Sequence, residues 1–165
     1  MKKYNLSLFI LTTILFALLP GCGGEPECPL NSTSLARFEF LDSKTHAAVK
    51  ITNGATVTGI SVVDGVVLED TLFNLAEASM SLPLSYTDRT TYVMHYSETL
   101  RDTIEVTHKN IPFVSDIECG TMMFYQVEGL RYTTNALDSV VLINPEITNE
   151  ERKNFNIYYR AAESE

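Results

Sequence analysis

The cysteines are the residues whose chemistry the surrounding sequence indicates most clearly. Cys22 follows Gly21 and an apolar run from Leu6 to Leu19 that begins after two lysines. This run is shorter than the about 20 residues that a helix needs to cross a bilayer, which favours a secretory signal. We therefore predict a lipoprotein signal peptide over residues 1–21 and acylation of Cys22 with palmitate-type chains, two or more of which make an anchor stable. A transmembrane anchor and an ordinary cleaved signal are the alternatives.

Lipidation of Cys22 leaves Cys28 and Cys119. In an oxidising compartment, two remaining cysteines most simply form one disulfide. This bond would close a loop of about 90 residues and stabilise the domain by about 4 to 5 kcal/mol in the chain-entropy model. The alternative is a reactive thiol at Cys119, which the acidic neighbour Glu118 disfavours because it opposes formation of the thiolate.

The other residues with acid–base or metal-binding chemistry are not spaced as in known sites. The sequence has three histidines: His46, His95 and His108. They lack the HxH and HExxH spacings of zinc sites, and we interpret them as surface or strand-end residues. Asp88, Glu98 and Asp102 form no dense run of calcium ligands, and GxSxG and Gly-rich phosphate motifs are missing. We expect no catalytic residue, no metal and no cofactor.

The formal net charge is −9, and removal of the signal lysines makes it more negative. Such a charge disfavours nucleic acid and anionic lipid surfaces as partners. Eight tyrosines and eight phenylalanines occur without tryptophan, and exposed aromatic side chains are typical of glycan platforms. The tyrosines that we consider for such a platform are Tyr86, Tyr92, Tyr125, Tyr132 and Tyr158. Core packing is the alternative interpretation of these rings.

Short alternating segments dominate the chain after Cys28 and predict strands. The expected strands are 34–40, a hairpin over 59–68 around Asp64 and Gly65, 71–75, 81–85, 91–96, 100–108, 121–127, 137–143 and 154–160. Pro83 restricts its strand to an edge or a bulge, whereas 137–143 is apolar on both faces and is expected to be central. Short helical turns are expected over 76–79 and 148–153. This pattern predicts an all-β fold, an antiparallel β-sandwich of immunoglobulin-like size, with a small barrel as the alternative.

The expected organisation has four parts. They are a signal peptide at 1–21, the lipidated cysteine and a linker at 22–33, the β-sandwich domain at 34–160 and a tail at 161–165. The domain is large enough for a core of its own.

Several short pieces of the sequence are similar to a known family. They are Leu-Pro-Leu at 82–84, Phe-Val-Ser at 113–115, Glu-Cys-Gly at 118–120, Asn-Pro-Glu-Ile-Thr at 144–148 and Asn-Ile-Tyr-Tyr at 156–159. Together they resemble an uncharacterised family of small Bacteroidota lipoproteins, a domain of unknown function, over about residues 28–159. The resemblance implies a cell-envelope location and the pairing of Cys28 with Cys119. It brings no assigned activity, so it implies no catalytic residue.

Three triplets resemble the Asp-Ser/Thr-apolar sites at which Bacteroidota attach O-glycans to exported proteins. The acceptor residues would be Thr71, Thr103 and Ser139. Thr103 has outward parity in its expected strand, whereas Ser139 shares a face with Val141 and Ile143. We expect modification of at least one triplet.

These observations predict a non-enzymatic accessory or scaffold domain. It would be anchored by lipid at the outer membrane, on the periplasmic face or at the cell surface, and would act through contacts with proteins such as an outer-membrane protein. The alternative is a surface module that binds a glycan or another ligand. An enzyme ranks third, because it would require a polar pocket assembled from distant residues.

Overall fold

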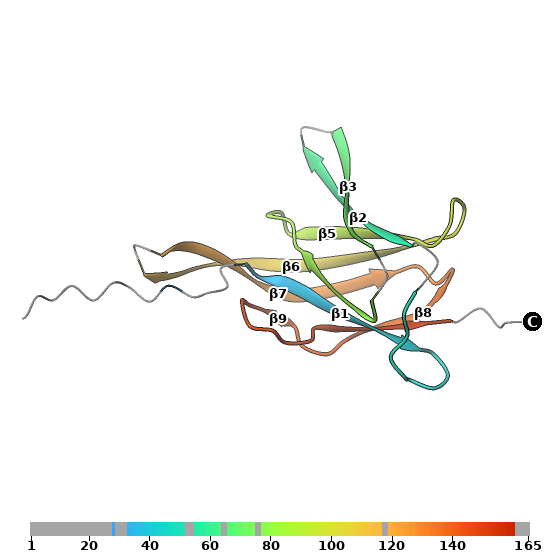
Figure 1. Ribbon diagram of the computed structural model, residues 1–165. Coiled ribbons are helices and arrows are strands. Elements are labelled where there is room, and N and C mark those ends of the chain that lie inside the picture. The colour runs from blue at the N-terminus through green and yellow to red at the C-terminus, as the bar shows by residue number, and fades with distance from the viewer. Residues whose placement is uncertain are drawn as a thin grey trace, which may run out of the picture.

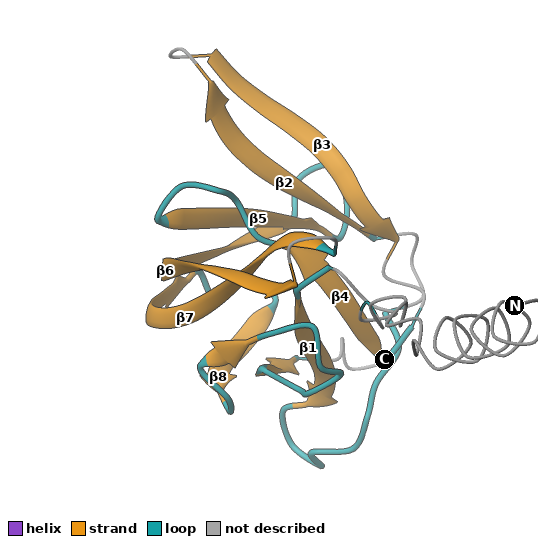
Figure 2. Ribbon diagram, turned by 90° about the vertical axis from the view of Figure 1, so that its left-hand side faces the viewer, coloured by secondary structure: helices purple, strands orange, loops and turns teal. Residues whose placement is uncertain are grey.

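The computed structural model describes Cys28 and residues 33–51, 55–63, 66–74, 77–116 and 119–160. These residues form two separate sheets that pack face to face (Figures 1 and 2). The first sheet has the order β4 (Ser79–Pro83), β1 (Leu35–Asp42), β10 (Phe155–Tyr159) and β8 (Leu137–Leu142). The second has the order β3 (Val66–Asn74), β2 (Thr56–Val63), β5 (Arg89–His95), β6 (Arg101–Asp116), β7 (Gly120–Tyr132) and β9 (Glu146–Ile147). The predicted β-sandwich is confirmed, and the sheets do not close into the alternative small barrel.

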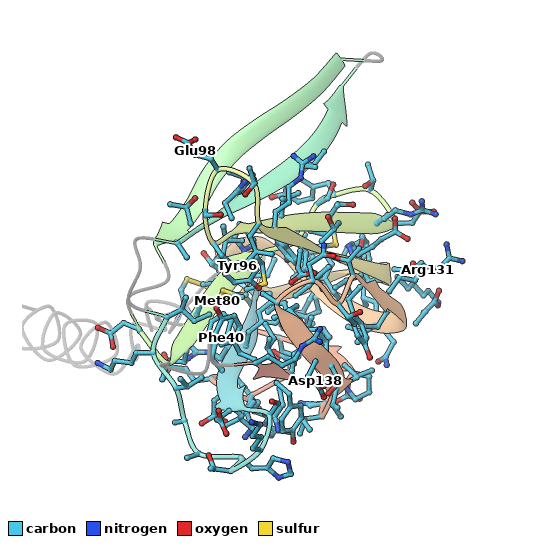
Figure 3. The ribbon with its side chains drawn as sticks, turned by 90° about the vertical axis from the view of Figure 1, so that its right-hand side faces the viewer. Phe40, Met80, Tyr96, Glu98, Arg131 and Asp138 are labelled. Atoms are coloured by element: carbon cyan, nitrogen blue, oxygen red, sulfur yellow. A yellow bond between two sulfur atoms is a disulfide. The ribbon has the colours of Figure 1, made fainter. Side chains whose placement is uncertain are left out.

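The core follows from the alternation of apolar residues along the strands. In β1, Phe38 and Phe40 are buried as the alternation predicts. The Phe38 ring stacks on Phe155 with centroids 4.6 Å apart and meets Tyr92 of the other sheet edge-on at 5.7 Å. Each such ring contributes roughly 2 to 3 kcal/mol when it is buried. Figure 3 shows Phe40 near the middle of the molecule, and its side chain is fully buried.

The sheet order differs from the sequence prediction at β8. Residues 137–143 were expected to be a central strand, and this is wrong, because β8 lies at the edge of its sheet. Val141 and Ile143, which suggested a second buried face, are exposed. The interior position belongs to β10, which pairs antiparallel with β8 and parallel with β1. This parallel pair is the exception to the antiparallel pairing of the described strands.

Two local predictions concern the hairpin of β2 and β3. The hairpin is confirmed, with Val63 opposite Val66, while its turn at 64–65 lies outside the described residues. The separate strand expected at 71–75 is wrong, because β3 continues without a break to Asn74. The hairpin projects from the rest of the molecule in Figure 2.

The two predicted helical turns are wrong where the structure describes them. Ser79 already begins β4, and residue 76 lies outside the described part. In 148–153 the Thr148 hydroxyl accepts from the Glu150 amide at 3.2 Å, so it forms a local turn and caps no helix. The described residues include no helix long and apolar enough to cross a membrane.

The hairpin of β6 and β7 is longer than the sequence indicated. Its first strand was expected to end at 108 and its second to begin at 121. In the structure, the two strands pair from Ile104 with Tyr132 to Asp116 with Gly120. The hairpin reaches one end of the molecule in Figure 1. Cys119, at its turn, forms the predicted disulfide with Cys28, with 5.3 Å between the Cα atoms.

Candidate functional site

A hydroxyl, an imidazole and an amide form a hydrogen-bonded chain beside β5 and β6. Thr90 Oγ1 lies 2.7 Å from His108 Nε2, and His108 Nδ1 lies 2.8 Å from Asn110 Oδ1. The Asn110 amide nitrogen donates to the carbonyls of Tyr86 and Thr87, which fixes the orientation of the amide. His108 therefore carries its proton on Nδ1, and its Nε2 accepts from the Thr90 hydroxyl.

This order of groups is that of a nucleophile, a general base and an orienting residue. However, Thr90 and His108 are both buried, at 5% and 1% exposure. Burial lowers the pKa of His108 and is the largest effect on it. The hydrogen bond that His108 donates to Asn110 and the charges of Asp88 and Glu128 act in the opposite direction and raise this pKa. Because a substrate cannot reach the Thr90 hydroxyl at this exposure, we interpret the hydrogen-bonded groups Thr90, His108 and Asn110 as structural. They hold the connection between β4 and β5 against β6.

The histidines were expected at the surface or at strand ends, and this is wrong for His108. It has the inward parity of Ile104 and Val106, and this parity was the signal that could have placed it. His95 is half-buried with Nε2 3.0 Å from Thr58 Oγ1, and His46 is exposed. No three of the described His, Cys, Asp and Glu side chains gather as metal ligands.

Asp102 is a fully buried carboxylate on the same inward face of β6. Its Oδ1 accepts from the Thr133 hydroxyl at 2.7 Å and from the Asn135 amide at 2.7 Å. Its Oδ2 accepts from the backbone amides of Ala136 at 2.7 Å and Leu137 at 2.9 Å. Both oxygens are thus occupied by protein donors, and Asp102 organises the connection between β7 and β8 rather than offering ligands to a cation.

A groove of about 470 Å³ lies beside the long hairpin. Its apolar side contains Phe113 of β6 and Phe124 of β7, whose rings stack with centroids 4.7 Å apart, and the buried Met122. The polar side comes from the segment after β8: Asn144, Glu146, Thr148, Asn149, Glu150 and Arg152. Arg152 and Glu150 form an ion pair at 2.6 Å, and the carboxylate of Glu146 leaves this side with one net negative charge.

Apolar side chains continue from the groove along β6. Ile111, Phe113 and Val114 are all exposed, as is Pro112 between them. Phe113 pairs with Met122 and Ile111 with Phe124, so these four side chains share one face of the hairpin. We call Ile111, Phe113 and Val114 the hairpin patch.

The second unpartnered surface is the free edge of β8. The amide of Ile143 donates to the Asn154 carbonyl at 2.7 Å, on the side of β10. Because backbone groups alternate along a strand, those of Val140 and Leu142 point to the opposite side. No described strand lies there. The exposed side chain of Val141 stands beside these open backbone groups.

The predicted modification sites do not form one site. Cys22 lies outside the described residues, and so does the side chain of Thr71. Thr103 is half-buried in β6, where its amide donates to the Thr133 hydroxyl at 2.9 Å. Ser139 is half-buried in β8, in the other sheet.

The tyrosines of the considered glycan platform are also separated. Tyr92 and Tyr125 are buried, and burial raises the pKa of both phenols above the ordinary value. Tyr92 donates to the Pro83 carbonyl at 2.8 Å and belongs to the core. Tyr86 is exposed in the connection before β5, and Tyr158 lies in the other sheet, where its ring contacts His46.

A family of unknown function, DUF6452, matches residues 54–159, which include β2 to β10. No curated protein and no solved structure matches the chain.

Proposed function

The chain belongs to DUF6452, a family of unknown function, and we propose that it is a lipid-anchored cell-envelope protein that acts through contacts with a protein partner. The family assigns no activity, so the proposal rests on the sequence before Cys28 and on the free edge of β8. In the finer form of the proposal, the protein is a Bacteroidota outer-membrane lipoprotein on either the periplasmic face or the cell surface.

The edge of β8 is the single observation that supports the contact role best. An unpaired strand edge is a template for another strand, and proteins commonly block such edges with proline or charge. β4, at the other edge of the same sheet, ends in Pro83. β8 contains no proline, has Asp138 as its one charged residue, and carries the exposed Val141. An extended segment of a partner can therefore add to this edge through backbone hydrogen bonds.

The test uses a charge placed on the edge. Val141→Glu places a carboxylate beside the open backbone groups and should abolish cross-links between the native lipoprotein and its partner. Leu100→Glu is the matched control, because Leu100 is 39% exposed and Val141 is 41% exposed, but Leu100 lies outside β8. The measurement is cross-linking and mass spectrometry in intact cells. Equal cross-links for wild type and Val141→Glu, or recovery of the protein alone in all cases, would count against the proposal.

The O-glycan expectation is part of the same proposal. Modification of Thr71, Thr103 or Ser139 adds mass, and the sequence places all three after the predicted signal. The intact mass of the protein purified from its native cells measures this directly. A mass explained by the lipid and the mature polypeptide alone would refute it.

A surface module that binds a glycan remains the alternative proposal. It is less well supported, because Tyr92 and Tyr125 of the platform considered for it are buried. Binding to a glycan array that is lost in Tyr86→Ala would favour it over the protein-contact role.

A further inference from the structure

We propose that the hairpin patch rests on the lipid surface to which the protein is anchored, so that the β6–β7 end of the sandwich faces the membrane. The inference rests on the lipid anchor at Cys22 that the proposed function includes. It adds an orientation and a second contact with the bilayer, which the anchor alone does not provide.

The tether sets which end of the domain lies near the membrane. Fully extended, the chain from Cys22 to Cys28 spans at most about 20 Å. The disulfide joins Cys28 to Cys119 at the turn of the hairpin. Without the disulfide, the first tie between anchor and sheet would be Leu35, at a reach of about 45 Å. The bond therefore holds the turn of the hairpin, and not an arbitrary part of the domain, close to the acyl chains.

The side chains at that end fit a lipid surface. The hairpin patch lies on β6, and all three of its side chains are exposed. Ile111 and Phe113 lie on one face of the hairpin and Val114 lies on the other, so both faces present exposed apolar side chains there. Exposed apolar residues that cluster mark an interaction site, whereas single ones are ordinary. Aromatic and aliphatic side chains at the boundary of headgroups and acyl chains add to the affinity of a lipid anchor.

The charge of the protein selects the kind of lipid. The formal net charge of the full sequence is −9 and becomes more negative without the signal lysines, so anionic headgroups repel the anchored protein. The contact is therefore apolar and belongs to a zwitterionic surface, and its strength should change little with salt. A protein partner on the hairpin patch is the competing occupant, and the test separates the two.

The sequence contains no tryptophan, so a single introduced tryptophan reports on one position. The lipidated protein is reconstituted into phosphatidylcholine vesicles, with and without brominated acyl chains that quench tryptophan on contact. The reporters are Phe113→Trp and, on the other face of the hairpin, Val114→Trp. Tyr132→Trp is the control, because Tyr132 is 38% exposed and Phe113 is 40% exposed. Tyr132 pairs with Ile104, about 30 Å along β6 from Phe113.

The inference predicts that brominated lipid lowers the emission at position 113 or 114 about twofold and leaves that at position 132 nearly unchanged, because a docked side chain lies at the acyl boundary. The quenching should persist at high salt. If the protein binds vesicles but the quenching at 113 and 114 is no greater than at 132, the lipid contact is overturned. A protein partner would then be the occupant of the hairpin patch. If no variant floats with the vesicles, the anchor itself is refuted, and the proposed function fails together with this inference.

Discussion

Replacement of Asp102 by asparagine tests how the structure holds β6, β7 and β8 together. The carboxylate accepts four hydrogen bonds, two on each oxygen, and is fully buried. In Asp102→Asn, one oxygen keeps two of these bonds, and the new NH₂ group faces two donors instead. Bonds to a charged acceptor contribute roughly 1.5 to 3 kcal/mol each, and relief of the buried charge offsets part of the loss. We expect the free energy of unfolding to fall by about 3 kcal/mol, a large share of the total for a domain.

The assay is urea unfolding of the purified full-length protein with its disulfide intact. Asp138→Asn is the matched control, because it removes an exposed carboxylate in neighbouring β8 and should leave the midpoint almost unchanged. Thr133→Val should be intermediate, since it removes one bond to Asp102 and leaves the Thr103 amide without its acceptor. A loss of less than about 1 kcal/mol in Asp102→Asn, or one equal to that of Asp138→Asn, would show that the four bonds to Asp102 do not stabilise the connection between β7 and β8.

Three further predictions concern the stability of the same domain. Cys28→Ser combined with Cys119→Ser should lower the free energy of unfolding by about 4 kcal/mol, because the disulfide spans 91 positions; an unchanged urea midpoint would contradict this. Burial lowers the pKa of His108 below its ordinary value of 6.5, so the unfolded chain binds the proton more readily, and stability should decline as pH falls below that value. The urea midpoint at pH 7.5 and pH 5 measures this, and an equally steep decline in His108→Gln would exclude His108 as the cause. Tyr92→Phe removes the bond to the Pro83 carbonyl and should cost about 1 kcal/mol by thermal unfolding, whereas a stabilised variant would be inconsistent with that bond.

The sequence was sufficient where a pattern is local. The alternation of Ala36, Phe38 and Phe40 predicted a half-buried strand, and each of these residues is buried in β1. Residues 137–143 are apolar on both faces, and this pattern led to the wrong prediction of a central strand. Exposed apolar residues at an unpaired edge look the same in sequence as residues of a strand buried on both sides.

Features that join distant residues were not predictable from one sequence. Asp102 meets its four donors about 30 residues later in the chain, and the proton position on His108 depends on backbone carbonyls of another connection. The expected strand ended at 108, and Pro112, which is unfavourable inside a sheet, lies in the part of the long hairpin that was not predicted. Since β5 pairs with β6 only as far as Thr107, Pro112 lies where one side of β6 has no described neighbour, and its missing amide proton costs no ladder bond there.

Both the contact role and the membrane orientation require a lipid anchor at Cys22, and the mass of the amino-terminal peptide of the protein from its native cells measures that anchor. We expect a chain that begins at Cys22 and carries a diacylglyceryl group on sulfur. A chain that still begins at Met1, or one that begins elsewhere without lipid, would contradict this expectation.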